Sequence, residues 1–387
     1  MTEGLKGRPK RRLWRWGLRR WGLGLLILLA FVALSLPLAL RSETVNRAVD
    51  RAALGDKVAF ASSRFELKCP LPFDDGDSLE NLTRALPLRD LRIEPLDLHR
   101  YSDEGLIQEK LSFESTVKLR HAESNRAVAY IYRHGPLGRR PVVVWVPGLY
   151  VSDIAFRPIF WFFDEIFARG VDVVFYVLPY HLERSPEGME SGQALLATDL
   201  ADHLGALAQG LADLRSLTAW LRGQGVKRLG AIGGSFGGGL LLRQITMEPA
   251  YDFMTVFIPL LSWEDVIYAN ETTTALRESL AGLTTKQQAS LRRAWRAMDP
   301  ASHIPQLAAE RISALPALYD QVARSEPFDA WRKAWGIKRV HPLNRGHTLA
   351  LFTSELYEAY GKMLDTDLRA TQKRSSLSRD PIADPGM

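Results

Sequence analysis

Residues 228–240 read RLGAIGGSFGGGL, a short apolar run followed by a glycine-rich turn and the start of a helical pattern. Gly233, Ser235 and Gly237 form a G-x-S-x-G motif within this stretch. Between a strand and a helix, such a motif folds as a tight turn that holds its serine in a strained, exposed position above a sheet. The pattern therefore predicts Ser235 as a nucleophile, with Gly233 and Gly237 as the glycines of the turn.

Other glycine-rich motifs fit this stretch less well. A dinucleotide-binding fingerprint requires glycine where Ser235 stands, and a phosphate-binding P-loop requires a Gly-Lys-Ser/Thr sequence that is absent here. A turn with a purely structural role remains the alternative.

Outside this turn, apolar runs alternate with helical patterns. The run PVVVWV at 141–146 is typical of a strand buried on both faces of a parallel sheet. Alternation of strands and helices predicts an α/β fold whose parallel sheet is covered by helices. We expect strands at 110–118, 127–133, 141–146, 171–178, 228–232, 253–261, 312–319 and 337–340. We expect helices at 154–169, 193–222, 240–246 and 348–364, a small helical cap at 264–310 and a disordered tail at 371–387.

A nucleophilic serine needs a base and an acid, which follow it along the chain as acid and then histidine in this class of turn. His347 lies in a loop before the last predicted helix, where it can reach the serine as a general base. Asp320 follows the predicted strand 312–319 and can orient the imidazole and stabilise its charged form. The alternatives are His341 and His303 for the base, and Glu326 and Asp329 for the acid.

An oxyanion hole needs two backbone N–H donors. The amide of Phe236, directly after the predicted nucleophile, is the expected first donor. The second should come from the loop after the strand 141–146, where Gly148 permits close backbone approach; we expect Leu149, with Tyr150 next. A Gly148 that only turns the chain is the alternative.

The segment 127–364 resembles the α/β-hydrolase fold family, and within it a poorly characterised branch of abhydrolase-domain proteins. The matching motifs are GGSFGG at 233–238, IPLLSW at 258–263, LPYH at 178–181 and Gly346-His347. The resemblance implies a mostly parallel eight-stranded sheet, a Ser–His–acid triad and neither a cofactor nor a metal. Many esterases of the family carry His-Gly in the oxyanion loop, whereas Pro147-Gly148 stands here, which leaves the second donor open.

The amino terminus predicts a membrane anchor. Residues 21–40 read WGLGLLILLAFVALSLPLAL, twenty residues without a charge, which is long enough to cross a bilayer. Residues 1–20 contain eight Lys or Arg and one acid, so the positive-inside rule keeps them in the cytoplasm and places the folded domain on the other side of the membrane, which is the periplasm if the source is a bacterium. A cleaved secretory signal and a twin-arginine export signal are the alternatives.

The remaining chain divides into a stalk with an amino-terminal extension at 41–109 and a hydrolase domain at 110–370. The net charge is +6, of which residues 1–20 supply +7, so the rest of the chain sums to −1 and a nucleic-acid partner is not expected. The single cysteine, Cys69, excludes an intramolecular disulfide.

These features predict a membrane-anchored serine hydrolase that cleaves carboxylic (acyl) esters of small or lipid-like molecules. Alternatives are a catalytically inactive scaffold or binding module, and a thioesterase, peptidase or acyltransferase with the same triad. Near the site, Arg184 could hold an acidic group of the substrate or face solvent, beside His181. Pro158–Phe163 and Trp295 could form apolar pocket walls or belong to the core.

Overall fold

The computed structural model describes residues 40–61, 71–96, 105–151, 153–196, 199–268, 277–278 and 280–377. Among these residues, no helix is both long and apolar enough to span a bilayer. The predicted basic tail, Cys69 and the predicted anchor, apart from Leu40, lie outside the described residues.

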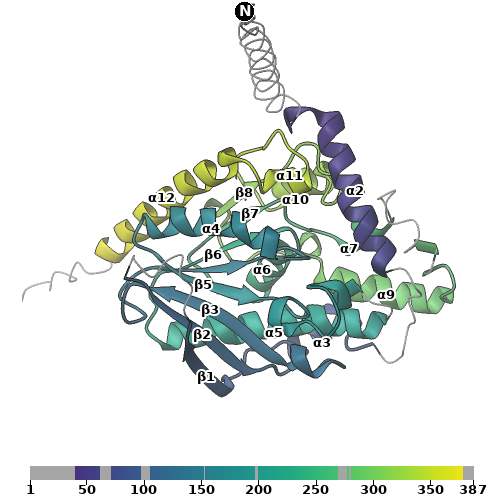
Figure 1. Cartoon of the computed structure of the whole chain (residues 1–387), viewed down its shortest axis with the longest axis horizontal. Coiled ribbons are helices and arrows are strands. Elements are labelled where there is room, and N and C mark those ends of the chain that lie inside the picture. The colour runs from purple at the N-terminus through teal and green to yellow at the C-terminus, as the bar shows by residue number, and fades with distance from the viewer. Residues whose placement is uncertain are drawn as a thin grey trace, which may run out of the picture.

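The described chain forms one nine-stranded sheet with helices on both faces (Figure 1). The strand order is β1-β2-β3-β5-β4-β6-β7-β8-β9, with antiparallel pairing from β1 to β5 and parallel pairing from β5 to β9. The strands are β1 Arg89–Pro95, β2 Ile107–Glu114, β3 Arg126–Arg133, β4 Val142–Val146, β5 Asp172–Val177, β6 Leu229–Gly234, β7 Phe253–Phe257, β8 Ile312–Leu315 and β9 Arg339–Val340.

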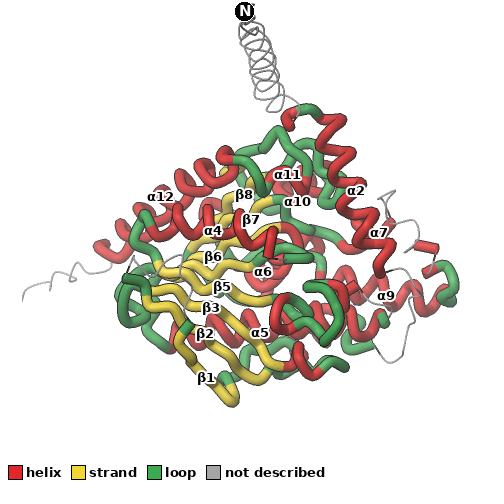
Figure 2. The backbone as a smooth tube through the Cα atoms, viewed as in Figure 1, coloured by secondary structure: helices red, strands yellow, loops and turns green. Residues whose placement is uncertain are grey.

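Alternating side chains of the central strands build two apolar layers. In β4, Val142, Val144 and Val146 enter the core on one face, while Val143 and Trp145 enter the core on the other. This is the period of two that a strand buried on both faces requires. Figure 2 shows the strands running through the middle of the molecule with helices on either side.

Helices α5 and α6 pack together on one face, and α4 and α12 pack together on the other. The α-helices are α2 Glu43–Ala61, α3 Gly76–Leu82, α4 Asp153–Phe167, α5 Leu200–Gly223, α6 Ser235–Met247, α7 Trp263–Tyr268, α9 Thr285–Met298, α10 Ser325–Ala334, α11 His347–Ala350 and α12 Ser354–Leu377.

The structure differs from the predicted elements in several places, among them helix α10, which stands where the sequence predicts a loop around Glu326 and Asp329. The sheet has nine strands and not eight: the additional strand is β1, a short and fully exposed edge strand in which only Leu91 and Ile93 alternate with charged residues. Strand β7 ends at Phe257, where Ile258 takes a φ of +42°, and β8 ends at Leu315, because Pro316 has no N–H to donate to the sheet. Helix α12 continues to Leu377, into the segment predicted to be disordered.

The predicted cap is helical at α7 and α9, and α9 packs against α3, α5 and α7. Trp295 of α9 is fully buried, as are Phe162 and Phe163 of α4, so these aromatic side chains belong to the core and do not line a pocket.

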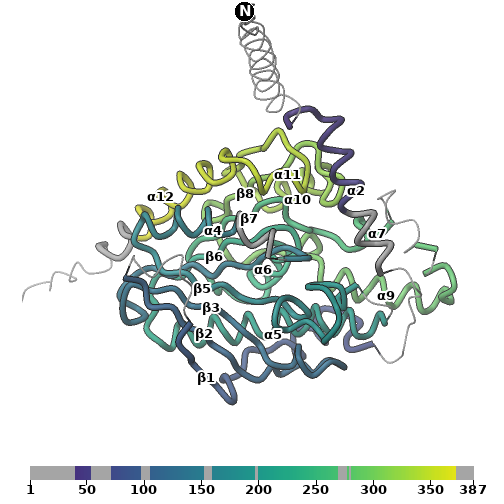
Figure 3. Tube along the Cα trace, in the orientation of Figure 1, coloured from purple at the N-terminus to yellow at the C-terminus, as the bar shows by residue number. Residues whose placement is uncertain are grey.

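Helix α2 lies in the range predicted to be a stalk and extension, and it packs against α11 and the 3₁₀ turn η4, Gln193–Leu196. Figure 3 shows this purple amino-terminal helix beside the carboxyl-terminal part of the chain. Helix α2, near the amino terminus, and helix α11, near the carboxyl terminus, are therefore in contact.

Candidate active site

The turn from β6 into α6 holds Ser235 in a left-handed backbone conformation, with φ of +49°. A Cβ on Gly237 would lie 2.4 Å from the carbonyl oxygen of Val146 and 2.2 Å from that of Pro147, so only glycine permits this approach of β4. A Cβ on Gly233 would lie 2.9 Å from the backbone nitrogen of Gly238 and 2.7 Å from the side chain of Leu241. The two predicted elbow glycines are thus required by close contacts of the backbone.

Four adjacent strands end in strained loops around this turn. Non-glycine residues with positive φ follow β4 (Tyr150), β5 (Tyr180 and Leu182), β6 (Ser235 itself) and β7 (Ile258). Such conformations cost free energy and persist where the surrounding packing over-determines them, which is common at active sites.

The structure brings Ser235, His347 and Asp320 together. Nε2 of His347 lies 2.9 Å from Oγ of Ser235, and Nδ1 lies 2.7 Å from Oδ2 of Asp320. The other carboxylate oxygen of Asp320 accepts N–H bonds from Val322 and Ala323 at 2.8 and 2.7 Å. The imidazole is therefore held between a hydroxyl and a carboxylate that is itself fixed by backbone donors.

Electrostatics in this buried cluster raise the pKa of the imidazole, which makes it a stronger base. Burial by itself would lower the pKa of His347, but the carboxylates of Asp320 and Asp50 outweigh it and raise that pKa above its ordinary value. Burial also raises the pKa of Asp320, although the neighbouring His347 opposes that change. The arrangement can accept a proton from Ser235 and stabilise the resulting positive charge.

The other predicted candidates lie elsewhere. Nε2 of His303 is 3.1 Å from the carbonyl oxygens of both Arg296 and Ala297. Glu326 and Asp329 are exposed residues of α10 that pair with Arg324 and Arg332. None of these side chains is in contact with Ser235.

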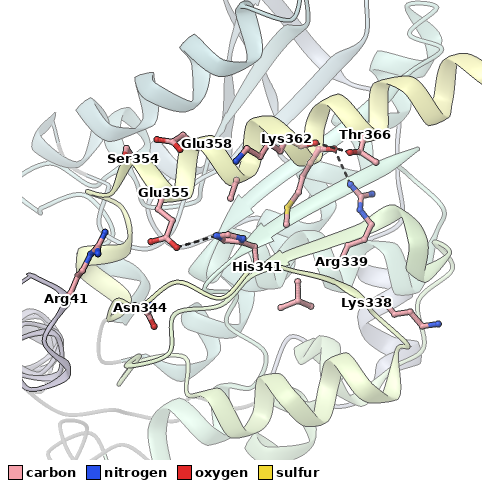
Figure 4. A pocket seen from close by; sticks show the side chains of 13 residues that line it. Arg41, Lys338, Arg339, His341, Asn344, Ser354, Glu355, Glu358, Lys362 and Thr366 are labelled. Carbon is pink, nitrogen blue, oxygen red and sulfur yellow. Dashed lines mark hydrogen bonds and ion pairs between the residues drawn. The ribbon is translucent and has the colours of Figure 1, made fainter.

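His341 faces a separate groove between β9 and α12, where it lies 3.4 Å from the carboxylate of Glu355 (Figure 4). The groove has a volume of about 720 Å³ and carries charges of both signs. None of Ser235, His347 and Asp320 lines it.

His181 holds the loop after β4. Its Nδ1 donates to the carbonyl oxygen of Pro179 at 2.8 Å, and its Nε2 accepts the N–H of Tyr150 at 3.1 Å. Burial lowers the pKa of His181 to about 4, so the ring is neutral near pH 7 and Nε2 stays an acceptor. Because the Tyr150 amide is used in this bond, Leu149 is the better placed second oxyanion donor of the two that the sequence indicates.

Two further residues define the predicted oxyanion region. Phe236 is the second residue of α6, and amides of a helix's first turn have no acceptor within the helix. Gly148 lies against the nucleophile, since a Cβ there would be 3.0 Å from Cβ of Ser235.

Arg184 neither faces solvent nor is open to a substrate, which corrects both readings of the sequence. It is fully buried and lies 2.9 Å from the carboxylate of Asp213, with further bonds to the hydroxyl of Tyr176 and the carbonyl oxygen of Ser124. Arg184 therefore forms a buried ion pair that connects the loop after β5 to helix α5.

Sequence reasoning missed Asp50, which comes from α2. Its buried carboxylate accepts the backbone N–H groups of Gln321, His347 and Thr348 at 3.2, 2.7 and 2.9 Å. No local motif around Asp50 signals this role, because its partners are about 270 to 300 residues away in the chain.

Comparison with known proteins gives matches only among solved structures, since no family model and no curated protein sequence matches the chain. An acetyl xylan esterase from Paenibacillus sp. R4 superimposes with a TM-score of 0.51 at 16% identity, over 76% of this chain and 93% of that one. The chain has the α/β-hydrolase fold.

Two other α/β-hydrolase structures are similar at lower scores. Acetyl xylan esterase 1 from Thermoanaerobacterium sp. has a TM-score of 0.49 at 16% identity, over 79% of this chain and 98% of that one. The acylaminoacyl peptidase of Pyrococcus horikoshii has a TM-score of 0.48 at 13% identity, over 76% of this chain and 45% of that one.

The geometry predicts that His347 titrates above the ordinary histidine value of about 6.5. Asp320→Asn should lower the pKa of His347, because the substitution removes the nearer carboxylate while the imidazole stays buried. The measurement is an NMR titration of the histidine rings, with the His347 resonance assigned from its absence in His347→Ala. A His347 pKa unchanged by Asp320→Asn would contradict this account of the site.

Proposed function

We propose that this α/β-hydrolase is a serine hydrolase that cleaves carboxylic (acyl) esters through a Ser235–His347–Asp320 triad. The observation that carries the proposal is the continuous hydrogen-bonded line from Oγ of Ser235 through both ring nitrogens of His347 to the buried Asp320. Ser235, in a strained backbone conformation at the amino terminus of α6, is the nucleophile that this line would activate; its side chain is buried and not exposed as the motif predicted.

The steps follow from the positions of these atoms. Oγ of Ser235 attacks the ester carbonyl carbon while Nε2 of His347 takes the hydroxyl proton, and Asp320 stabilises the imidazolium. The amides of Phe236 and Leu149 would bind the oxyanion of the tetrahedral intermediate. His347 then gives its proton to the leaving alcohol, and water repeats the cycle on the acyl-serine to release the acid.

Ester bonds are proposed as the substrate class on two grounds. The Paenibacillus protein, with the same fold over three quarters of this chain, is named as an acetyl xylan esterase. An enzyme tethered at a bilayer by residues 21–40 would in addition meet small or lipid-like esters. A thioesterase, a peptidase, an acyltransferase and an inactive scaffold are the other outcomes that the following experiment separates.

The full-length chain should react with a fluorophosphonate probe, because such probes label activated serines without reference to substrate. Ser235→Ala and His347→Ala should abolish labelling and lower ester turnover by about four to six orders of magnitude. His341→Ala is the matched control, since it removes a histidine that faces the separate groove, and it should label like the wild type.

Outcomes of this experiment discriminate between the functions. Labelling at Ser235 with hydrolysis of aryl or alkyl esters supports the esterase. Labelling together with faster turnover of thioesters or peptides moves the assignment to those classes, and transfer of the acyl group to an added alcohol in preference to water identifies an acyltransferase. A folded chain that does not label, or that labels without Ser235, overturns the triad and favours the scaffold.

His181→Phe should lower kcat by about tenfold to a hundredfold with less effect on KM, because the Tyr150 amide loses its acceptor and the oxyanion loop its fixed position. The control is His121→Phe, since His121 contacts the ring of Tyr180 and does not bond to the oxyanion loop. Steady-state kinetics on one ester measures both. Equal kcat values in the two variants would show that His181 does not position the oxyanion loop.

We also propose that residues 21–40 anchor the chain with its amino terminus in the cytoplasm and the catalytic domain on the other side. Full-length protein should then stay in the membrane pellet after an alkaline carbonate wash, and external protease should digest the domain. Leu28→Arg with Phe31→Arg should release it, as each arginine near a span's centre costs about 2.5–3.5 kcal/mol of insertion free energy. Leu13→Arg, in the basic tail, is the control, and wild-type protein found in the wash would refute the anchor.

A further inference from the structure

The amino-terminal helix α2 reaches the two loops that carry the proposed base and acid. It packs against α11, whose first residue is His347, and against η4, which follows the connection that contains His181. In Figure 1 the purple helix α2 lies beside α11, near the carboxyl-terminal elements of the chain.

Asp50 is the centre of this contact. One carboxylate oxygen accepts the N–H groups of Gln321 and His347, and the other accepts that of Thr348. Gln321 directly follows Asp320, so a single buried side chain bonds to the backbone of the acid loop and to that of the histidine loop. A carboxylate with backbone N–H donors makes charge-assisted bonds, which are stronger than neutral ones.

Asn46, one helical turn earlier in α2, extends the same contact. Its Oδ1 accepts the N–H of Gly346 at 2.7 Å, and its Nδ2 donates to the carbonyl oxygens of Leu40 and Ser42 at 2.8 Å each. One side chain therefore links the last residue of the predicted anchor to the residue before His347.

Gly346, directly before His347, allows the close approach of helix α2. A Cβ on Gly346 would lie 2.6 Å from Oδ2 of Asp50 and 3.0 Å from the carbonyl oxygen of Asn46. Glycine at position 346 is thus the residue that allows α2 to approach the loop, which is an observation independent of the hydrogen bonds themselves.

We propose that Asp50, assisted by Asn46, is a positioning residue that fixes the loops carrying Asp320 and His347 relative to Ser235. Helix α2 then contributes to the geometry of the active site. The inference rests on the proposed serine-hydrolase function and names a residue that acts through His347 without touching the substrate. It makes the segment between the predicted anchor and the sheet necessary for catalysis, although that segment contains none of the triad.

The first test compares Asp50→Asn and Asp50→Ala in the full-length protein. Asp50→Ala removes all three acceptor bonds and should slow fluorophosphonate labelling of Ser235 by about a hundredfold, the loss expected from a small misplacement of a catalytic group. Asp50→Asn keeps one acceptor oxygen and the size of the side chain, so it should fall between Asp50→Ala and the wild type. In ester turnover the loss should lie in kcat and not in KM.

The control is Glu43→Gln, which removes one negative charge from the same helix. Glu43 is exposed and pairs with Arg47, with no bond to either loop, so labelling should remain at the wild-type rate. Gly346→Ala tests the contact from the other side and should reproduce the loss of Asp50→Ala. Circular dichroism and thermal unfolding establish that each variant is folded.

The pH profile separates positioning from a purely structural role. The ionisable side chains that act on His347 are Asp320, from the loop after β8, and Asp50, from α2, and Ser235 of α6 is its other partner. Since the Asp50 carboxylate raises the pKa of His347, Asp50→Asn should move the acid limb of the labelling rate to lower pH. A variant that is merely less stable would keep the acid limb in place.

NMR keeps the inference testable if the protein proves not to be a hydrolase. In Asp50→Asn the His347 ring should titrate at lower pH than in wild type, and in Asp50→Ala the resonance of the Nδ1 proton shared with Asp320 should shift or disappear. Absence of labelling in wild type would then refute the proposed function alone. Folded Asp50→Asn and Asp50→Ala proteins with wild-type His347 titration and an unchanged Nδ1 proton would overturn the positioning role.

Discussion

Close backbone packing at the turn between β6 and α6 is the constraint on which the rest of the site depends. Gly237 lies against the carbonyl groups at the end of β4, and the N–H of Leu260, after β7, donates to the carbonyl oxygen of Ser235 at 2.9 Å. The loops after three neighbouring strands are therefore in contact at one point. The positive φ values at Tyr150 and Ile258 show that the flanking loops adopt strained conformations around it.

Buried polar side chains hold the loops that surround this turn. His181 fixes the loop after β4, Arg184 fixes the loop after β5 through Asp213, and Asp50 bridges the loops after β8 and β9. Burying such groups is costly unless they are hydrogen-bonded, and each of these is. Buried hydrogen bonds thus fix the loops around the turn, while apolar packing fills both faces of the sheet.

The two carboxylates beside His347 have different geometries. Asp320 contacts the ring nitrogen, where it can set the tautomer and stabilise the charged ring, while Asp50 contacts the backbone N–H of the same residue. Both negative charges raise the pKa of the imidazole. Asp320 therefore acts on the charge and tautomer of the ring, whereas Asp50 fixes the position of the backbone that carries it.

The sequence by itself determined the features that short-range patterns encode. Short apolar runs between turn and helix signals predicted eight of the nine strands. The glycine spacing around Ser235, together with chain order, singled out the three residues that the structure brings into contact. Tertiary structure alone decided the strand β1, which has no buried face, and the burial of Arg184, whose partner Asp213 lies on another element. It also decided the place of Asp50, whose bond to His347 joins residues 297 positions apart, because hydrogen bonds between distant segments leave no periodicity in either one.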